Sequence, residues 1–535
     1  MNWLAQTTML SFGWRRFLLL LIAGAVAGLS MPPIFFLLLI FLAFPIWVWA
    51  LDGAEKKTGL GRIFGPAFTI GFSFGLGYFL VALHWFGAAF FVDGGWLLVL
   101  MPFAVLALSA VLAMFWGFAS SLAFYFWSDS AWRILALAFA LSVAEILRGQ
   151  LFSGFPFDLL GYALSANDMM AQLTSVIGIY GLSAITALIA FMPALIWPTD
   201  NRALTRRLIP FFTIIVIIVV QMAYGQYRLD SVKIIEREDI KLRLVQPNIK
   251  QAQKWQAGAS DMIMERLISL SKTKLDVGDA GLNGITYVIW PEAAIPSYLS
   301  KKPQYVAQIG RMLPLGKYLI TGAPRDETLA NGEQVAYNSI MMFNSSGEVV
   351  DSYDKTHLVP FGEYLPFENI FKKFGLKQFV PGNDGWKAGK TRSVMSANSI
   401  APFLPLICYE VIFSASLGED IRNADFILNL TNDGWFDGSI GLAQHFHHAK
   451  IRAIEEGRSL VRVANTGITA LIDPLGRVRA QINKGEAGIL DISPPRPLAG
   501  TFFTKYKNNP LFLVLFIVFL VLVFQKIRNR RIKNL

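Results

Sequence analysis

The sequence has almost no cysteine. Cys408 is the only one among 535 residues. A single thiol cannot form a disulfide within the chain, and a metal site built from pairs of cysteines is excluded for the same reason. A lone cysteine is therefore either a small buried hydrophobic residue or a reactive group.

Charged residues are also scarce. They make up 16% of the chain, against 54% hydrophobic residues, and the mean hydropathy is +0.47. These values lie outside the usual range of soluble proteins and predict a membrane protein. The formal net charge of +11 does not indicate a nucleic-acid partner, because the basic residues form no cluster with aromatic or groove-reading partners. Many of them instead flank apolar runs.

Apolar runs of spanning length occur along the first 230 residues and again near the C-terminus. A helix needs about 20 apolar residues to cross the hydrocarbon core. The sequence predicts about eight spans, at 16–31, 33–51, 64–90, 95–127, 132–148, 168–197, 208–225 and 510–524. We therefore expect a transmembrane helical domain over residues 1–229, a second domain over 230–505, and a last span with a basic tail over 506–535.

The basic residues predict the orientation of these spans. If both termini lie in the cytoplasm, the basic residues of most short loops also fall inside: Lys56, Lys57, Arg62, Arg133, Arg202, Arg206 and Arg207. The outer loops near 30–33 and 92–95 contain no lysine or arginine, and only the loop with Arg148 disagrees. By the positive-inside rule, we expect residues 230–505 to lie outside, which for the inner membrane of a bacterium means the periplasmic side.

The first apolar run has a second interpretation. Two arginines precede it and small residues end it, as in a cleaved signal peptide. Cleavage would leave seven spans and would remove the agreement among the charged loops, so we expect this run to be a span.

Beyond Ile240, short β-rich runs alternate with helical stretches. The predicted strands lie within 240–248, 285–292, 317–324, 336–344, 404–410, 424–432 and 459–465, with helices near 260–272, 305–313 and 441–457. This alternation is typical of a layered α/β domain. Glu292 and Cys408 come where apolar strands end, and ligands and catalytic groups gather at such ends in open α/β sheets.

Three segments of this domain carry titratable groups in apolar or turn-forming surroundings. They are VIWPEAAIP with Glu292, DKTHLVPFGEYLPF with Lys355 and Glu363, and LPLICYEVIF with Cys408, Tyr409 and Glu410. Each has a structural explanation: a helix cap for Glu292, a solvated loop charge for Lys355, and buried filling for Cys408. Together they fit covalent catalysis, because a thiol needs a base and its anionic tetrahedral adduct needs a fixed cation.

The order Glu292, Lys355, Cys408, with WPE, DKTHLVPFGEYLPF, ICYE and NLTNDGWF around them, resembles the nitrilase, or carbon–nitrogen hydrolase, superfamily. Within it, the membrane-embedded apolipoprotein N-acyltransferases match best, over essentially the whole chain. The resemblance implies a multi-pass α-helical membrane domain and a periplasmic α/β nitrilase-like domain built as an αββα sandwich.

The resemblance also implies roles for individual residues. Glu292 is expected to be the general base, Lys355 the group that stabilises the oxyanion, and Cys408 the nucleophile that becomes a thioester. The supporting residues are Glu363, which orients Lys355 and the base, Tyr409 and Glu410, which shape the pocket, and Trp255, which matches a tryptophan on a mobile arm of the family.

The reaction implied by the resemblance is a ping-pong transfer. A phospholipid acyl donor acylates Cys408, and the α-amine of a diacylglyceryl-modified apolipoprotein then attacks the thioester, with no metal or organic cofactor. One rival is a membrane-anchored amidase in which water takes the acyl group. Another is a transporter or sensor whose nitrilase-like domain only binds a ligand.

Two mixed apolar segments are suited to a lipid interface. Residues 367–380 interleave phenylalanines with lysines, and the loop 149–162 has a similar character. The structural alternative for residues 367–380 is a lid packed on its own domain.

We expect structural roles for the remaining ionisable residues that stand out in the sequence. The HFHH run with His445, His447 and His448 lacks the i, i+4 pairing with a base that a zinc-peptidase helix requires, so we expect no metal there. Within the predicted spans, we expect His84 to form a hydrogen bond inside the bundle and Glu145 to pair with Arg148 one turn on.

Overall fold

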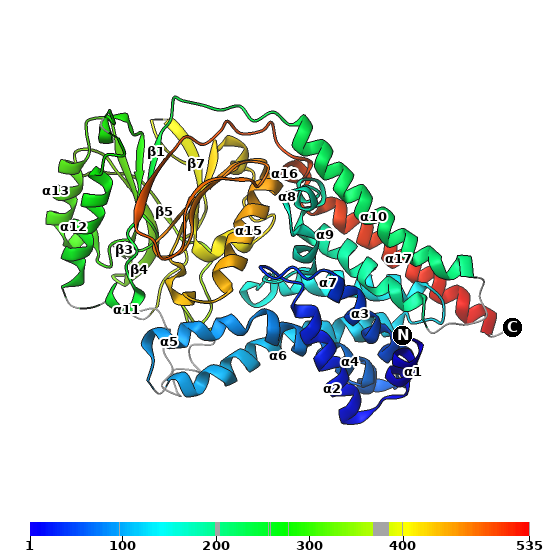
Figure 1. The fold of residues 1–535 in the computed structure, drawn as a ribbon. Helices are drawn as coiled ribbons and strands as arrows, with labels where there is room; N and C mark the ends of the chain where they lie inside the picture. Colours follow the sequence, from blue (N-terminus) through cyan, green and yellow to red (C-terminus); the bar gives the residue numbers. More distant parts are fainter. Residues whose placement is uncertain are drawn as a thin grey trace. The chain divides into compact units, whose positions relative to one another are not determined.

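The computed structural model describes residues 1–95, 97–197, 204–254, 256, 258–276, 278–366, 385–398 and 400–533. Trp255 and the segment 367–380 lie outside the described residues. The chain divides into two compact units, residues 1–232 with 505–535 and residues 233–504. The first is built of helices and the second of sheets covered by helices (Figure 1).

The helical unit begins with α1, before the first predicted span. Its helices are α1 (Asn2–Leu10), α2 (Gly13–Gly28), α3 (Leu38–Asp52), α4 (Pro66–Ala82), α5 (Phe90–Asp93), α6 (Leu97–Tyr125), α7 (Trp132–Arg148), α8 (Asp168–Ala171), α9 (Thr174–Phe191), α10 (Leu204–Ser231) and α17 (Asn509–Lys533). The short α16 (Phe502–Tyr506) precedes α17.

Four helices of the described chain are long and apolar enough to cross a membrane. They are Leu98–Tyr125, Thr174–Leu195, Arg207–Ser231 and Asn509–Arg531. A fifth span results if Pro66–Ala82 and His84–Val92, which meet at a bend of 50°, are counted together. The other predicted spans form helices of 16, 15 and 17 residues, α2, α3 and α7. Length and composition therefore support four or five of the eight predicted spans, and of the three remaining helices only α3 counts as an apolar helix, although a short one.

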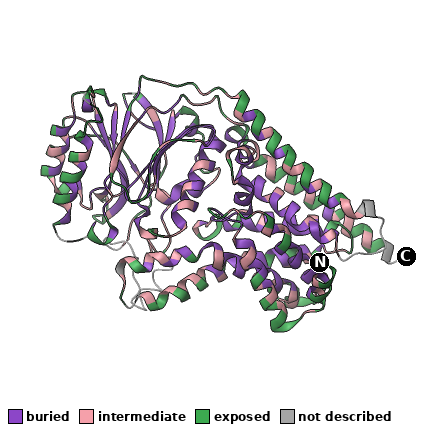
Figure 2. Cartoon of the chain, viewed as in Figure 1, coloured by how far each residue is buried: buried purple, intermediate pink, exposed green. Residues whose placement is uncertain are grey.

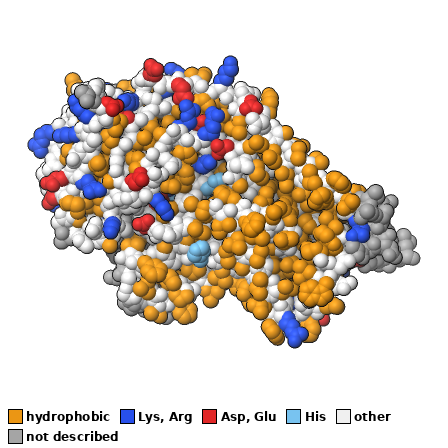
Figure 3. Space-filling model, viewed as in Figure 1, with side chains coloured by type: hydrophobic (Ala, Val, Ile, Leu, Met, Phe, Trp, Pro, Cys, Tyr) orange, Lys and Arg blue, Asp and Glu red, His pale blue; other side chains and the backbone are white. Residues whose placement is uncertain are grey.

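The long helices turn apolar side chains outward. On α10 and α17 the exposed large hydrophobic residues include Phe211, Phe212, Val216, Val219, Val220, Phe512, Leu513, Val514, Phe516 and Ile517. On the face that Figure 3 shows, hydrophobic side chains make up most of the described surface of the helical unit. A continuous apolar surface of this kind is unfavourable in water and suits contact with lipid.

The interior of the helical unit holds a buried ion pair. Arg148 donates to both carboxylate oxygens of Glu145, at 3.0 and 2.7 Å, and Trp116 Nε1 donates to Glu145 at 2.7 Å. The predicted pairing of Glu145 with Arg148 is confirmed. The expectation for His84 is wrong: His84 is exposed, and its Nδ1 lies 2.8 Å from the carbonyl oxygen of Val81, one turn back on its own segment.

The α/β unit contains two six-stranded sheets. The first has the order β12-β1-β2-β3-β4-β5, built from Gly488–Ile492, Leu242–Gln246, Tyr287–Ile289, Tyr318–Thr328, Gln334–Phe343 and Val349–Asp354. The second has the order β11-β10-β9-β8-β7-β6, built from Val478–Ile482, Thr469–Ile472, Ser459–Ala464, Phe426–Thr431, Ile400–Ile407 and Met395–Ala397. In each sheet the parallel strands, β1-β2-β3 and β7-β8-β9, are flanked by antiparallel ones.

The two sheets pack face to face. One buried hydrophobic cluster joins Leu244 and Ile289 of the first sheet with Phe403 and Leu428 of the second. The central strands β1, β2, β8 and β9 are buried along their whole length, and Figure 2 shows both sheets mostly in the colour of buried residues. This shared core explains why the strands read as continuous apolar runs, since both of their faces are covered.

Helices cover the outer faces of both sheets. α12 (Ala259–Lys272) and α13 (Pro303–Met312) share a second buried cluster with Val288 and Leu319 of the first sheet. α15 (Gly441–Glu456) contacts β9 of the second sheet. The layered α/β arrangement predicted from the sequence is therefore present, as four layers in the order helix, sheet, sheet, helix (Figure 1).

Candidate active site

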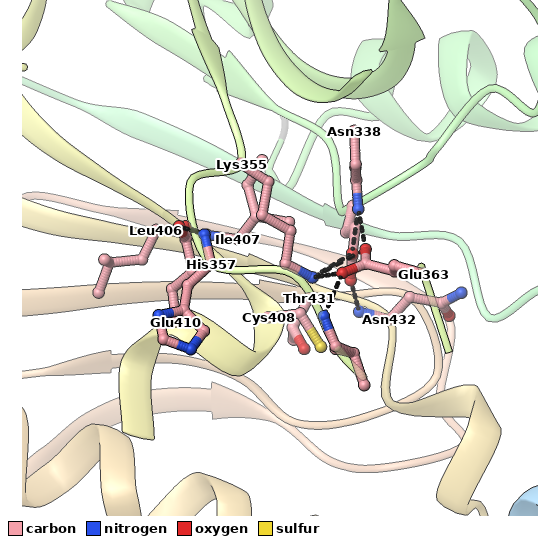
Figure 4. Close-up of polar contacts among 12 residues, drawn as sticks. Asn338, Lys355, His357, Glu363, Leu406, Ile407, Cys408, Glu410, Thr431 and Asn432 are labelled. Atoms are coloured by element: carbon pink, nitrogen blue, oxygen red, sulfur yellow. Dashed lines mark hydrogen bonds and ion pairs between the residues drawn. The ribbon is translucent and has the colours of Figure 1, made fainter. Parts of the chain in front are cut away.

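Glu292, Lys355 and Cys408 lie at the ends of three strands. Glu292 follows β2, Lys355 comes directly after β5, and Cys408 comes directly after β7. β2 and β5 belong to one sheet and β7 to the other, so Cys408 meets Glu292 and Lys355 only because the sheets pack face to face. Figure 4 shows the labelled Lys355, Glu363 and Cys408 near one another.

Glu292 is buried and hydrogen-bonded through both carboxylate oxygens. Its Oε1 accepts from Asn338 Nδ2 at 2.8 Å, and its Oε2 accepts from the main-chain N–H of Asn432 at 2.8 Å. Burial raises the pKa of Glu292, and Glu363 adds to this effect while Lys355 opposes it. A carboxylate with a raised pKa, held in place, is suited to take up a proton during a reaction.

Lys355 is 1% exposed, so its explanation as a solvated loop charge is wrong. Its Nζ lies 2.9 Å from both carboxylate oxygens of Glu363 and 3.9 Å from Glu292 Oε1. Burial alone would lower the pKa of Lys355, but the two carboxylates outweigh burial and raise it. The side chain therefore remains an ammonium, the fixed positive charge that an oxyanion requires.

Glu363 is held by more than Lys355. The main-chain N–H of Val359 donates to its Oε2 at 2.8 Å, and Asn338 Nδ2 donates to its Oε1 at 2.9 Å. Asn338 thus donates to Glu292 and Glu363 at once. The resemblance implied that Glu363 orients Lys355 and the base, and these contacts are compatible with that role.

Cys408 sits at a sharp turn of the main chain. Its φ is +48°, and it begins a short 3-10 helix, Cys408–Ile412. Burial raises the pKa of the Cys408 thiol, as do Glu292 and Asp433, whereas Lys355 and a hydrogen bond with Thr431 lower it without reversing the shift. The sulfur is therefore a thiol at neutral pH, and it needs a nearby base before it can attack.

Glu410 links the lysine segment to the cysteine strand. It is fully buried, and its Oε2 accepts from the main-chain N–H of Ile407 at 2.8 Å. Its Oε1 accepts from Tyr353, the main-chain N–H groups of Thr356 and His357, and Arg392, at 2.6, 3.0, 3.1 and 2.9 Å. One carboxylate thus ties the residues after Lys355 to the residue before Cys408.

The other predicted site residues are placed differently. The Tyr409 ring is buried, with its centroid 5.1 Å from that of Phe413 and 6.0 Å from that of His357. Trp255 is not among the described residues, but Lys254 beside it donates from Nζ to the carbonyl oxygen of Glu292 at 3.3 Å.

The histidine run meets the site from α15. His445 Nδ1 lies 2.9 Å from Asp433 Oδ1 and His445 Nε2 lies 3.2 Å from the carbonyl oxygen of Cys408. Cys408, Asp433 and His445 are the one grouping of possible metal ligands found in the described part of the chain. Arg462 donates to Asp433 Oδ2 at 2.8 Å, and its positive charge makes this donor set unfavourable for a cation.

Sequence reasoning did not single out several residues of this site. Asn338, Arg392 and Asn432 contact the predicted residues directly, and Asp433 contacts His445, which in turn lies against the carbonyl oxygen of Cys408. A signal existed for Asn338, because it is a polar residue inside the apolar run AYNSIMMFN, where an unpartnered amide would be costly.

Two family models match the chain. The carbon-nitrogen hydrolase model matches residues 241–497 and the apolipoprotein N-acyltransferase N-terminal domain model matches residues 23–192. Apolipoprotein N-acyltransferase from Rhodopseudomonas palustris is 37% identical over 529 residues, covering 98% of this chain and 97% of that protein. The Brucella suis protein of the same name is 39% identical over 499 residues, covering 92% of each.

Among solved structures, a mutant of the Nesterenkonia AN1 amidase from the nitrilase superfamily is similar to this chain, with a TM-score of 0.33 and 15% sequence identity. The matched region covers 52% of this chain and 98% of the amidase chain.

Proposed function

The chain belongs to the apolipoprotein N-acyltransferase family, and we propose that it carries the acyl group on Cys408, with Glu292 as the base and Lys355 as the oxyanion partner. It is an acyltransferase of the inner membrane, and its acceptors are lipoproteins. The roles of the individual residues, the acyl donor and the orientation in the membrane belong to the proposal.

In the first half-reaction a phospholipid acylates the enzyme. Glu292 takes the proton of the Cys408 thiol as the sulfur attacks the ester carbonyl carbon, and the Lys355 ammonium stabilises the resulting oxyanion. The carbon–oxygen bond to the glycerol then breaks, and the leaving oxygen takes the proton from Glu292. The products are a thioester on Cys408 and a lysophospholipid.

In the second half-reaction the α-amine of a diacylglyceryl-modified apolipoprotein attacks the thioester carbon. The amine gives a proton to Glu292, the carbon–sulfur bond breaks, and the sulfur recovers its proton. The product is an amide, and the enzyme returns to its starting state. Transfer to the amine rather than to water requires a site that excludes water and holds the amine in attack geometry.

One observation carries the proposal most directly. Glu292, Lys355 and Glu363 are buried together, with the lysine nitrogen 2.9 Å from one carboxylate and 3.9 Å from the other. The raised pKa of Glu292 and of the Cys408 thiol suits a proton that passes from sulfur to carboxylate and back. The fixed positive charge of Lys355 is what the anionic intermediate needs.

We also propose an orientation. Eight membrane passages place both termini in the cytoplasm and the α/β unit on the periplasmic side. The support is the lysine and arginine content of the short loops, together with the outward apolar faces of α10 and α17.

Cysteine labelling tests the proposed orientation. In a Cys408→Ala background, a cysteine placed at the exposed Lys56 should react with a membrane-impermeant maleimide only after the membrane is opened. Reaction in intact spheroplasts would show the opposite orientation.

The covalent step is tested by mass spectrometry. Purified protein incubated with phospholipid and no acceptor should gain one acyl mass on the Cys408 peptide, and the Cys408→Ala protein should gain none. Glu292→Gln should acylate at least about 100-fold more slowly, the usual effect of losing a general base. Adding a diacylglyceryl peptide should then release the adduct as an N-acyl peptide.

Three outcomes would contradict the proposal. Free fatty acid without N-acyl peptide would make the protein a hydrolase. Acyl transfer at the normal rate by the Cys408→Ala protein would contradict the covalent mechanism. An adduct that the acceptor cannot discharge would show that the thioester is not an intermediate.

A further inference from the structure

The main chain of Cys408 is in a conformation that ordinary residues avoid. Its φ of +48° lies in the left-handed region, directly after β7. A residue with a Cβ atom persists there only where surrounding contacts impose it, and such positions concentrate at functional sites. The contacts that hold this turn therefore also determine where the sulfur points.

Two side chains lie against the carbonyl oxygen of Cys408. His445 Nε2 is 3.2 Å away, and Asn429 Nδ2 is 3.5 Å away and also 3.4 Å from the carbonyl oxygen of Leu406. A contact of 3.5 Å is at the limit of a hydrogen bond, so His445 makes the stronger contact. His445 lies on α15, 37 residues after Cys408 in the chain.

His445 is itself held in place. Its Nδ1 lies 2.9 Å from Asp433 Oδ1, and Asp433 accepts hydrogen bonds from the Thr431 hydroxyl at 2.9 Å and from Arg462 Nη2 at 2.8 Å. His445, Asp433 and Arg462 are all buried, and Arg462 is fully so. A rotation of the imidazole away from Cys408 would therefore break its contacts with two buried charged side chains, Asp433 and Arg462.

The position of the proton on His445 decides which of these contacts are hydrogen bonds. The contact with Cys408 is a hydrogen bond only when Nε2 carries a proton. In the neutral form with its proton on Nε2, Nδ1 accepts from Arg462 Nη2 at 3.1 Å and makes no hydrogen bond with Asp433, because both atoms are then acceptors. In the imidazolium, Nδ1 donates to Asp433 and Nε2 donates to the Cys408 carbonyl. The neutral form with its proton on Nδ1 pairs with Asp433 but cannot donate to Cys408, so the proposal requires one of the first two forms.

We propose that His445 is a positioning residue, which holds the carbonyl oxygen of Cys408 and thereby the left-handed turn that aims the sulfur at the acyl carbonyl. A trans peptide keeps C=O and N–H on opposite sides, so the same contact fixes the direction of the main-chain N–H of Tyr409. His445 acts through the main chain of the nucleophile. The inference rests on the proposed role of Cys408.

Two substitutions separate this role from a general packing role. Glutamine can place an amide nitrogen where His445 Nε2 lies, whereas asparagine reaches only the position of Nδ1. His445→Gln therefore keeps a donor for Cys408, and His445→Asn keeps only the contact with Asp433. His447, which is also buried on α15, offers a control, because His447→Asn shows what replacing a buried histidine of this helix costs in stability.

The measurement is the rate of Cys408 acylation in a single turnover with phospholipid, followed by intact mass, with the melting temperature of each variant. We expect His445→Asn to acylate about 10- to 100-fold more slowly than His445→Gln, the effect of losing one hydrogen bond that supports the reacting group. The melting temperatures of these two variants should be similar, and His447→Asn should acylate at a rate that follows its stability alone.

Equal rates for His445→Asn and His445→Gln would overturn the proposal, and so would rates that simply follow the melting temperatures of all three variants. If wild-type protein takes no acyl group from phospholipid, the proposed function fails instead. The same comparison is then made with iodoacetamide, which alkylates the single cysteine without an acyl donor. A slower reaction of His445→Asn than of His445→Gln would still support positioning, and equal alkylation would refute it.

Discussion

Lys355 Nζ lies 2.9 Å from both carboxylate oxygens of Glu363 but 3.9 Å from the nearer oxygen of Glu292. Asn338 donates to both carboxylates, at 2.8 and 2.9 Å. Glu363 therefore neutralises the lysine through direct contact. The Lys355 ammonium is further from Glu292 and lowers the pKa of Glu292 by less than burial raises it, so Glu292 can still accept a proton.

Replacing Lys355 with methionine should destabilise the protein and abolish acylation. It leaves two buried carboxylates that share one amide, and removing one partner of a buried ion pair costs about 3–5 kcal/mol. Unfolding in detergent, followed by tryptophan fluorescence, measures the loss of stability.

The double variant Lys355→Met/Glu363→Gln serves as the control for that prediction. It removes the repulsion between the carboxylates, so most of the stability should return while acylation stays absent. If Lys355→Met alone is as stable as the wild type, the buried pair does not contribute in the way argued above.

The two charges beside Cys408 should move its titration in opposite directions. Burial and the Glu292 carboxylate raise the pKa of the thiol, and the Lys355 ammonium lowers it. Glu292→Gln should therefore lower the pKa of Cys408, and Lys355→Met should raise it further. The pH dependence of iodoacetamide labelling measures both shifts, and Cys408→Ala provides the blank because the chain has one cysteine. Shifts in the same direction would show that the two side chains do not act through their charges.

Glu410→Gln should slow acylation by more than its effect on stability explains. An amide replaces one acceptor oxygen with a donor, which then faces a main-chain N–H or Arg392. A buried unpaired donor costs about 1–3 kcal/mol. Because Glu410 holds the residues beside Lys355 and Cys408, both catalytic groups should shift.

Glu455 offers a matched control for Glu410. It is also fully buried and pairs with an arginine, Arg452. Glu455→Gln should lower the melting temperature without slowing acylation of the folded protein. If both variants slow acylation equally, Glu410 has no special role in the site.

Lys254 should make stability depend on pH. Burial lowers its pKa from 10.5 to about 8, although Glu292 opposes the shift. Below pH 8 the lysine is charged in both the folded and the unfolded states, and the folded state carries the full cost of burying it. Between pH 8 and 10.5 the unfolded chain binds more protons than the folded one, so the free energy of unfolding rises with pH.

The comparison with Lys254→Met isolates this effect. Wild-type protein should gain stability relative to Lys254→Met as the pH rises from 8 to 10.5, measured as the difference in melting temperature. The exposed Lys250 supplies the control, since Lys250→Met removes a lysine that is already in water. A constant difference between wild type and Lys254→Met across this range would contradict the lowered pKa.

Local patterns in the sequence predicted much of the fold. The apolar runs that became β1, β2, β3, β4, β7, β8 and β9 all have both faces covered, and α12, α13 and α15 follow the predicted helices closely. β5, β6, β10, β11 and β12 were not predicted. β5, β11 and β12 carry exposed or half-buried residues along much of their length, so they lack the continuous apolar signal of a buried strand.

The helical unit shows the limit of counting apolar residues. The run 64–90 reads as one span, but it breaks where Pro66–Ala82 meets His84–Val92 at 50°. Glu145 and Arg148 were paired correctly because one helical turn separates them. The hydrogen bond predicted for His84 inside the bundle is absent because His84 is exposed. Whether a residue at a helix end faces the neighbouring helices depends on how the helices pack.

By themselves, the residues determined which groups are available for chemistry: one thiol, a carboxylate after an apolar strand, and a lysine in a turn. These follow from composition and from the order of residues, which no folding step can change. Only the tertiary structure decided which partner each group meets. Asn338 reaches the site from a neighbouring strand and His445 from a helix. Asn432 meets Glu292, and Glu410 meets the residues after Lys355, across the two sheets, and such contacts exist only after the sheets have packed face to face.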